Sequence, residues 1–339
     1  MKALRYLNPL VLKTEEIDLP LCGAGEALVR VHAAGICGSD MAIFTGKHPR
    51  AKPPLVMGHE FAGEIVEIQA GGIETPLAVG DKVTAYPLLV CGKCWACRNG
   101  FSHVCRDLKL IGIDRDGGFA EYVNMPLDLL VKFPGQLSFD QAALIEPLAV
   151  GVHALEMAGK PDWQAAVVVG CGPIGLMVGL CLKNAGTENL LMCDINPHRV
   201  KRAAGLNFQV INSAVENLGD RVTEMTQGEG ADIVFECAGS APAALQVCDL
   251  VRPRGKIIMV SVHKEPHPLD LRAISFKEIS MVGTRVYTRS DFRQALQMIA
   301  DLPYQDVISH RVELERGAEG FDIMGQAVDA CKVIIRTVY

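Results

Sequence analysis

Residues 167–194 read VVVGCGPIGLMVGLCLKNAGTENLLMCD, and this stretch decides the fold. It begins with an apolar run, turns through glycines at 170–175, continues as an apolar helical segment and ends in a second apolar run at 189–194. That order predicts a strand, a tight turn, a helix and a parallel strand. Because strands and helices go on alternating to about residue 284, we expect an α/β fold with a doubly wound parallel sheet.

The glycine-rich turn has the spacing G-x-G-x-x-G. In this context Gly170 permits the tight turn, Gly172 lets the backbone approach a pyrophosphate, and Gly175 lets the helix pack closely on the strand. The helix N-terminus offers N–H groups and a partial positive charge to phosphates. We therefore predict a dinucleotide site rather than a turn with no ligand, with the loop contacts Gly170, Gly172, Pro173, Ile174 and Gly175.

An acidic residue predicts which dinucleotide binds. Asp194 ends the second strand, where a carboxylate meets the hydroxyls of the adenosine ribose. Such a carboxylate repels a 2′-phosphate, so we expect NAD rather than NADP. Arg199 is a further expected cofactor contact; together with His198, Lys201 and Arg202 it also adds positive charge that weakens the discrimination.

Four cysteines crowd into one short segment, at Cys91, Cys94, Cys97 and Cys105. Two-residue gaps let a tight loop wrap three sulfurs around one ion, and the longer gap returns the fourth. Because four ligands fill a tetrahedron, we expect a structural zinc in a lobe at about 88–108. Disulfides or coincidence are the alternative. A DNA-binding finger does not suit a chain with a net charge of −6 and a pI near 5.9.

A second group suggests an open metal site. Cys37 in CGSD and His59-Glu60 in GHE supply a thiolate, an imidazole and a carboxylate. Catalytic zinc takes about three protein ligands and keeps a position open for water or substrate. Neither piece is specific alone, since a lone cysteine is commonly a buried apolar residue and a lone His-Glu pair commonly lies on the surface.

The rest of the chain predicts a second, β-rich region. Short apolar runs punctuated by Gly, Asp and Pro fill residues 1–145, and a last strand ends the chain. We expect a split domain, 1–145 with 285–339, around a nucleotide domain at 146–284. The start of the chain lacks the continuous apolar segment of a signal peptide, and the apolar run Val167–Leu182 carries four glycines, so we expect a cytoplasmic protein with neither a membrane nor a nucleic-acid partner.

Together these motifs resemble the zinc-containing medium-chain dehydrogenase/reductase family over essentially the whole chain. The matching pieces, in order, are GICGSD at 35–40, GHEFAGEI at 58–65, GDKV at 80–83, the four cysteines, DGGFAEY at 116–122, the glycine turn and the final ACKVIIR. Glu60 directly after His59, and IEPLAVGVH at 145–153, resemble its sorbitol/polyol dehydrogenase branch, which includes galactitol-phosphate, sugar-acid (L-gulonate or L-galactonate), butanediol and threonine dehydrogenases.

This resemblance implies a GroES-like catalytic domain joined to a Rossmann domain, with one catalytic and one structural Zn²⁺ per chain. It implies that Cys37, His59 and one or both of Glu60 and Glu146 hold the catalytic zinc, and that Ser39 hydrogen-bonds the reacting hydroxyl. Many relatives have a histidine where this chain has Ala42, so the proton relay must take another route. Relatives are dimers or tetramers, so we expect a homodimer or homotetramer.

Substrate contacts are the least constrained prediction. The loop at 44–52 carries Lys47, His48 and Arg50, either as a solvated segment or as a binding site for a carboxylate or phosphate. Further candidates are Arg115, Arg285 and Tyr287. We expect an enzyme that oxidises a secondary alcohol of a polyol, sugar acid or sugar phosphate to a ketone. The alternatives are a threonine-type amino-alcohol dehydrogenase and a non-catalytic protein that binds zinc and a dinucleotide.

Overall fold

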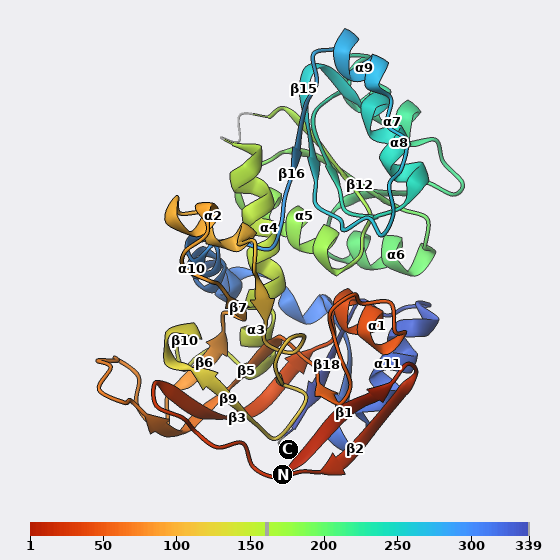
Figure 1. Ribbon diagram of the computed structural model, residues 1–339. Helices are drawn as coiled ribbons and strands as arrows, with labels where there is room; N and C mark the ends of the chain where they lie inside the picture. The colour runs from red at the N-terminus through yellow and green to blue at the C-terminus, as the bar shows by residue number, and fades with distance from the viewer. Residues whose placement is uncertain (160–162, 338–339) are drawn as a thin grey trace. The chain divides into compact units, whose positions relative to one another are not determined.

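The computed structural model describes residues 1–159 and 163–337 (Figure 1). The chain forms two compact units. One comprises Met1–Glu146 and Thr288–Tyr339, and the other is the continuous segment Pro147–Tyr287. Among the described residues, no helix combines the length and hydrophobicity needed to cross a bilayer.

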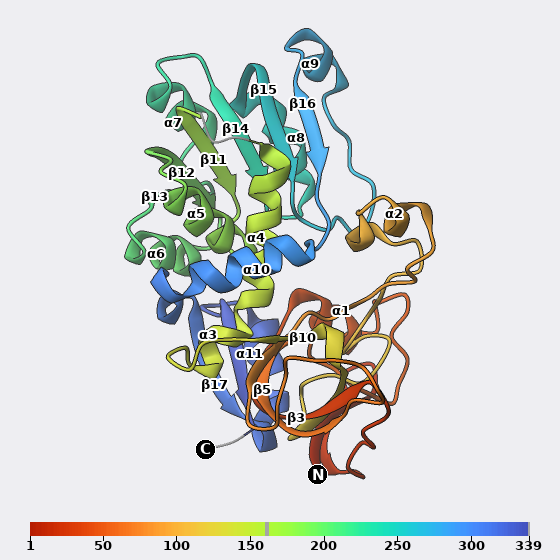
Figure 2. The same ribbon diagram turned by 90° about the vertical axis from the view of Figure 1, so that its left-hand side faces the viewer.

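The continuous unit is built on a six-stranded parallel sheet. Its strands run in the order β13-β12-β11-β14-β15-β16, so the chain winds outward in both directions from β11. Each neighbouring pair in this order is parallel, and Figure 2 shows the arrowheads of β11, β14 and β16 pointing the same way. The strands are β11 (Ala165–Val169), β12 (Asn189–Asp194), β13 (Gln209–Asn212), β14 (Ala231–Glu236), β15 (Val251–Met259) and β16 (Ser280–Gly283). This arrangement confirms the predicted doubly wound sheet.

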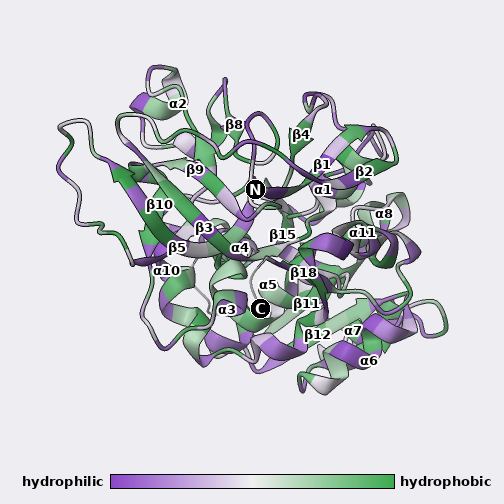
Figure 3. Ribbon diagram, turned by 90° about the horizontal axis from the view of Figure 1, so that it is seen from below, coloured by the Kyte–Doolittle hydropathy of each residue, from purple (hydrophilic) through white to green (hydrophobic). Residues whose placement is uncertain are grey.

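Helices connect these strands and cover the sheet. They are α4 (Ile145–Ala158), which leads into the unit, α5 (Pro173–Asn184), α6 (Pro197–Gly205), α7 (Leu218–Met225), α8 (Ala241–Leu250) and α9 (Leu271–Phe276). Every residue of β11 is buried, which explains its unbroken apolar sequence. By contrast, α6 and α7 show alternating hydrophilic and hydrophobic bands in Figure 3, as helices with one solvated face do.

The glycine turn between β11 and α5 needs its glycines. Gly170 has φ +104°, a conformation that residues with a side chain rarely adopt. At Gly175, an added Cβ would lie 1.8 Å from the carbonyl oxygen of Gly170. Pro173 follows the N-cap residue Gly172 as the first residue of α5, where its missing N–H costs no helical hydrogen bond. The local sequence therefore specifies a strand, a tight turn and a helix.

The discontinuous unit is β-rich. A seven-stranded sheet runs β10-β6-β5-β3-β18-β17, with β9 also paired to β3; a three-stranded sheet runs β2-β1-β4, and β7 pairs with β8. The strands are β1 (Lys2–Asn8), β2 (Val11–Glu16), β3 (Glu26–Gly35), β4 (Leu55–Val56), β5 (Glu60–Gln69), β6 (Lys82–Ala85), β7 (Leu88–Leu89), β8 (Lys109–Leu110), β9 (Tyr122–Pro126), β10 (Leu130–Lys132), β17 (Ile308–Glu313) and β18 (Lys332–Arg336).

Short helices surround these sheets. They are α1 (Gly38–Phe44), α2 (Trp95–Arg98), α3 (Phe139–Ala143), α10 (Arg289–Met298) and α11 (Gly317–Gln326), with 3-10 turns at Ser102–Val104, Leu127–Leu129, Ile299–Asp301, Tyr304–Asp306 and Leu314–Arg316. The last strand, β18, pairs antiparallel with β3, opposing Ile334 to Gly35. The C-terminal segment therefore completes a sheet that the N-terminal segment begins.

Candidate active site

Three potential metal ligands meet where strand β3 of the seven-stranded sheet ends and its neighbour β5 begins. Cys37 lies between β3 and α1, His59 directly precedes β5, and Glu60 is the first residue of β5. Because β3 and β5 are antiparallel and pair Gly35 with Glu60, the end of one strand lies beside the start of the other. The ligand atoms of the three residues all lie within 4.8 Å of one another. His59 and Glu60 are buried, at 4% and 1% exposure.

A buried carboxylate supports two of these ligands. Oδ2 of Asp40 accepts the backbone N–H of Cys37 at 2.8 Å, and Oδ1 lies 3.8 Å from Nδ1 of His59. Burial opposes a charge on His59, but the Asp40 carboxylate and the Cys37 thiolate outweigh it and raise the pKa of His59 well above its usual value. Metal-binding histidines commonly have such a carboxylate behind them, which leaves the other ring nitrogen for the metal.

Three polar atoms at this site are buried and lack a hydrogen-bond partner among the described residues. They are Oγ of Ser39, Oδ1 of Asp40 and Nδ1 of His59. Buried polar atoms are normally paired. Oδ1 of Asp40 and Nδ1 of His59 face each other at 3.8 Å, so Oγ of Ser39 is the atom that calls for a ligand. Glu146, 6% exposed at the start of α4, is near enough to raise the pKa of His59, although it lies outside the group of three. The donor set therefore fits a zinc ion with an open position.

The loop after α1 folds back on that helix. The backbone N–H groups of Lys47 and His48 both donate to the carbonyl oxygen of Ala42. Nδ1 of His48 accepts the N–H groups of Arg50 and Ala51. Burial lowers the pKa of His48, and both Arg50 and His59 contribute to the lowering, so His48 lies within electrostatic range of the candidate ligands.

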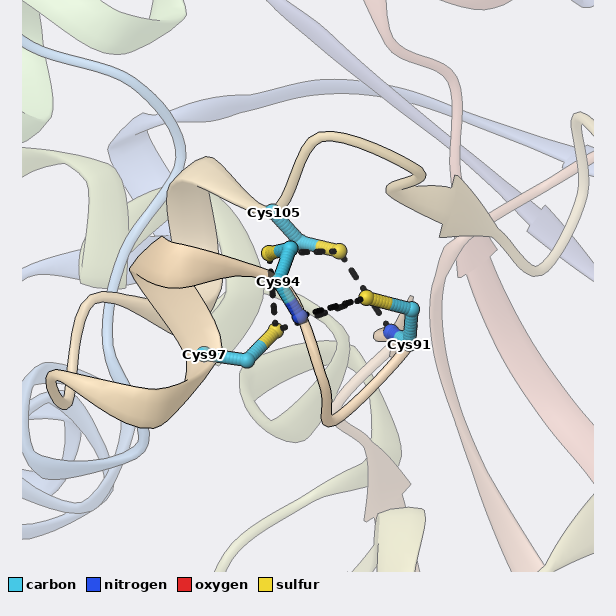
Figure 4. A group of neighbouring side chains, drawn as sticks. All are labelled: Cys91, Cys94, Cys97 and Cys105. Carbon is cyan, nitrogen blue, oxygen red and sulfur yellow. Dashed lines mark hydrogen bonds between the residues drawn. The ribbon is translucent and has the colours of Figure 1, made fainter.

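Four sulfurs face one another in the lobe around α2 (Figure 4). Sγ of Cys97 lies 4.0 Å from Sγ of Cys91 and 3.5 Å from Sγ of Cys94, and Cys94 lies 3.9 Å from Cys105. All four are free thiols. A tetrahedral zinc with Zn–S bonds of about 2.3 Å needs sulfurs about 3.8 Å apart. The spacing therefore fits one ion and does not fit disulfide bonds.

The charges in this lobe also suit a cation. Hydrogen bonds from the backbone at Cys97 and Arg106 lower the pKa of Cys94 to about 6. Burial and the neighbouring thiols raise the pKa of Cys97 to about 12. Several thiolates side by side repel one another unless a cation lies between them, and a zinc ion supplies that charge.

A cavity of about 450 Å³ opens at the carboxyl ends of β11, β12 and β14. Its wall includes Gly170, Gly172, Asp194 and Arg199. Oδ2 of Asp194 accepts the N–H of Cys171 at 2.8 Å, and NH1 of Arg199 lies 3.7 Å from the same oxygen. In doubly wound sheets, ligands bind at this edge, where the order of the strands reverses. The loop and its acid therefore line one cavity.

The predicted substrate contacts lie in different local surroundings within the two units. NH2 of Arg115 is bonded to Glu26 at 2.8 Å and to the carbonyl of Asn124 at 3.1 Å. Arg50 pairs with Asp114 at 3.1 Å. Lys47 is exposed. In the other unit, Arg285 is exposed and Tyr287 is completely buried. Lys47 and Arg285 are therefore exposed to solvent, whereas Tyr287 is buried. The guanidinium groups of Arg50 and Arg115 are already paired with carboxylates.

The sequence reasoning missed Lys332. This residue begins β18 in the discontinuous unit and is 2% exposed, and its Nζ contacts both carboxylate oxygens of Glu60, at 2.7 and 2.6 Å. A signal was present, since a lysine interrupts the apolar run ACKVIIR. Its partner, Glu60, lies 272 residues away in the sequence, so the residues around Lys332 could not predict this pairing.

Comparisons with known proteins agree on one family. Residues 23–135 match the family of alcohol dehydrogenase GroES-like domains, and residues 173–301 match the zinc-binding dehydrogenases. The chain is 34% identical to an L-threonine 3-dehydrogenase of Rhizobium etli over 96% of its own length and 95% of the relative's. It is 36% identical to a 2-dehydro-3-deoxy-L-galactonate 5-dehydrogenase of Pseudoalteromonas atlantica, over 82% and 81%. The crystal structure of 2R,3R-butanediol dehydrogenase from Bacillus subtilis superposes with a TM-score of 0.91 at 28% identity, covering 99% of both chains.

Proposed function

Because this chain belongs to the zinc-containing medium-chain dehydrogenase/reductase family, whose members act on CH–OH donors, we propose that it oxidises a secondary alcohol of a polyol, sugar acid or sugar phosphate to a ketone with NAD. The family implies zinc and a nicotinamide cofactor. The finer parts of the proposal are the substrate class, the choice of NAD, two zinc ions per chain and the roles of individual residues.

One observation carries the catalytic assignment. The ligand atoms of Cys37, His59 and Glu60 converge within 4.8 Å, and Oγ of Ser39 is buried beside them without a partner among the described residues. A zinc ion held by these residues would supply Lewis acidity, and a nicotinamide cofactor would supply the hydride acceptor. We assign Cys37 and His59 as ligands, with one or both of Glu60 and Glu146 completing the set.

The remaining roles belong to protein groups. Ser39 accepts the proton of the substrate hydroxyl through its unpaired Oγ and passes it outward. Asp40 keeps the ring of His59 in one orientation through its buried carboxylate. With alanine at position 42, His48 is our candidate for the next step of the relay, since the loop that carries it folds back on Ala42.

The cofactor proposal depends on Asp194. Its carboxylate is 8% exposed and lies in the wall of the dinucleotide cavity. A 2′-phosphate at about 4 Å would be repelled by about 4 kcal/mol at an effective dielectric of about 20. Arg199, 3.7 Å from that carboxylate, partly offsets the repulsion. Asp194→Ser should therefore raise kcat/KM with NADP about 10- to 100-fold relative to NAD, and an unchanged ratio would contradict the assignment.

The acidic-substrate proposal depends on the charged loop after α1. Lys47 is exposed, whereas Arg50 is paired with Asp114, so Lys47 is the cleaner test. Lys47→Ala should raise KM for a sugar acid or phosphate and leave KM for a neutral polyol unchanged. Equal effects on both substrates would show that the loop is merely solvated.

A second candidate is a threonine-type dehydrogenase. It is supported by the 34% identity to the Rhizobium etli enzyme over nearly the whole of both chains. Against it stands Ala42, at the position where many relatives carry a relay histidine. A substrate panel separates the two candidates, because threonine presents an ammonium group that a polyol or sugar acid lacks.

The deciding experiment assays the purified protein for NADH formation with polyols, sugar acids, polyol phosphates and threonine, and counts zinc per chain. We expect two zinc ions and a preference for one polyhydroxylated class. Cys37→Ser should lose one zinc and the activity, whereas Ser39→Ala should keep both ions and lose about 100-fold in kcat. Cys22→Ser is the matched control and should change neither, since its hydroxyl can keep the bond to the carbonyl of Glu26. A zinc-loaded protein that oxidises none of these alcohols would refute the proposal.

A further inference from the structure

Arg50 joins the loop after α1 to the segment that follows the four-cysteine lobe, residues 91–105. Its NH1 donates to the carbonyl oxygen of Leu108, 58 residues further along the chain, and its NH2 lies 3.1 Å from Oδ2 of Asp114. The side chain of Asp114 is 13% exposed, so this ion pair is partly shielded from water. One guanidinium therefore binds two points of that segment.

The loop that Arg50 anchors is ordered by four hydrogen bonds from backbone N–H groups. Those of Lys47 and His48 donate to the carbonyl oxygen of Ala42, at 2.8 and 3.0 Å. Those of Arg50 and Ala51 donate to Nδ1 of His48, at 3.3 and 3.1 Å. Because the imidazole of His48 binds the backbone of Arg50, the orientation of His48 depends on where Arg50 is held.

The lobe stands on a stem of two short strands, β7 and β8, which pair with each other and are two residues long. Leu108 directly precedes β8, and its N–H donates to the carbonyl oxygen of Cys105 at 3.2 Å. Sγ of Cys105 accepts the N–H of Cys91 at 3.4 Å. A chain of contacts thus leads from the four sulfurs through Cys105 and Leu108 to Arg50.

The lobe has little apolar core of its own. Its aromatic pair, Trp95 and Phe101, is stacked but exposed to solvent. After the stem, by contrast, Ile111 and Ile113 are buried. An ion bound by the four sulfurs would therefore supply most of the order of the lobe, whereas the segment that carries Asp114 stays packed without it.

We propose that the four-cysteine lobe, when its ion is bound, positions the loop 45–52 through Arg50. Leu108 holds Arg50, and Arg50 holds the loop that presents His48. The inference rests on the proposed function, in which His48 is the candidate for the next step of the proton relay. Arg50 is then a positioning residue rather than a substrate contact. Loss of the ion removes the contact at Leu108 and leaves the contact at Asp114, so the loop is loosened but not freed.

Amide hydrogen exchange tests this coupling in the wild type, Cys97→Ser, Arg50→Gln and the double variant. The amides at positions 47, 48, 50 and 51 report on the loop, because each donates one of its four hydrogen bonds. We expect Cys97→Ser to speed their exchange about tenfold, the effect of losing one hydrogen bond, and Arg50→Gln about 100-fold, since both contacts are lost. The double variant should match Arg50→Gln, because the lobe then has no contact through which to act.

Arg106→Gln is the matched control for a lost arginine. This residue also follows the lobe, but its side chain is 76% exposed and pairs with the adjacent Asp107 at 3.5 Å. The control should therefore exchange its loop amides as the wild type does. A purely structural role for the lobe predicts instead that exchange rises throughout the seven-stranded sheet, β3 included, and not at the loop alone.

Asp114→Asn separates positioning by Arg50 from direct substrate binding. An asparagine can still accept the N–H of Leu110, as Oδ2 of Asp114 does at 2.9 Å, but it has no charge to hold the guanidinium. Positioning predicts faster exchange at the four loop amides and a lower kcat. Direct binding predicts unchanged exchange and a lower KM for a sugar acid or phosphate, because the freed guanidinium then reaches the substrate. That second result would overturn the proposal.

Two further results would also overturn it. One is a Cys97→Ser protein that has lost one zinc yet exchanges its loop amides at the wild-type rate. The other is a double variant in which the two effects multiply, which would show that the lobe acts by another route. If Cys97→Ser does not fold, Arg50→Gln still decides, since unchanged exchange in that variant would show that Arg50 does not hold the loop. Exchange needs no substrate, so a protein that shows the coupling but oxidises no alcohol would refute the proposed function alone.

Discussion

Asp140 should be a major contributor to the stability of the discontinuous unit. This residue lies on α3, and its side chain is 9% exposed. Oδ2 accepts Nε of Arg311 on β17 at 2.7 Å and NH2 of Arg336 on β18 at 2.7 Å, and Oδ1 accepts Nε of Arg336 at 3.3 Å. A single carboxylate thus joins a helix from the N-terminal segment to two strands from the C-terminal segment.

The free-energy cost of removing the Asp140 carboxylate depends on how deeply that carboxylate and its two arginine partners are buried. Removing one partner of a fully buried pair costs about 3–5 kcal/mol, because the other charge is stranded. Here the two arginine side chains are 36% and 42% exposed, so water solvates much of their charge once the carboxylate is gone. We therefore expect Asp140→Ala to cost about 2–3 kcal/mol, near the value of charge-assisted hydrogen bonds. For a unit of about 200 residues this lowers Tm by about 4–12 °C.

Thermal unfolding followed by circular dichroism measures this shift. The matched control is Asp128→Ala, because Asp128 forms the same kind of pair with Arg289 but is 73% exposed. The control should change the free energy of unfolding by less than about 1 kcal/mol. Equal Tm values for the two variants would refute the argument that burial decides the strength of these pairs.

The same network predicts a pH dependence. Burial opposes the charge, but the hydrogen bonds from Arg336 and Arg311 outweigh it and lower the pKa of Asp140 below its usual value. The folded state therefore binds the proton less tightly than the unfolded state, where the pKa is about 3.9. The stabilisation is complete above that pH and is lost as pH falls through the lower folded pKa. The difference in unfolding free energy between wild type and Asp140→Ala should shrink below about pH 4.

Two further predictions concern the lobe and the glycine turn. Cys97→Ser should lose one zinc per chain and make the lobe sensitive to limited proteolysis, because three sulfurs hold the ion less firmly than four. Metal analysis checks this loss, and the Cys22→Ser control should retain both ions. Retention of both ions in Cys97→Ser would count against a structural zinc. Gly175→Ala places a Cβ 1.8 Å from the carbonyl oxygen of Gly170, so α5 must shift and dinucleotide binding should weaken more than tenfold in a fluorescence titration. Gly205→Ala, whose Cβ meets nothing within 4 Å, is the control, and equal affinities for the two variants would contradict the packing argument.

Much of the fold could be predicted because its signals are contiguous. The stretch at 167–194 specifies β11, the turn, α5 and β12 through residues at most a few positions apart. Their alternation fixes a parallel sheet with helices on its faces, and the observed strand order confirms that class. The four cysteines are likewise local, and their sulfurs converge as the spacing predicts.

The family and the enzyme class were also predictable, and the matches to both family domains confirm them. The exact substrate could not be predicted, because specificity depends on side chains that the fold brings together from distant segments. Arg115 illustrates the difficulty. It was a candidate for binding an anion, yet its guanidinium is bonded to Glu26, 89 residues away.

The sequence by itself determined the local units of this protein: the turn that suits a dinucleotide, the four-sulfur lobe, and the Cys37 and His59-Glu60 segments. Only the tertiary structure decided which groups surround them. It placed Lys332 on Glu60 and joined Asp140 to Arg311 and Arg336. The physical reason is that spacing within a turn or helix is set by covalent geometry, whereas a contact across hundreds of residues is set by strand register and packing, which no short segment specifies.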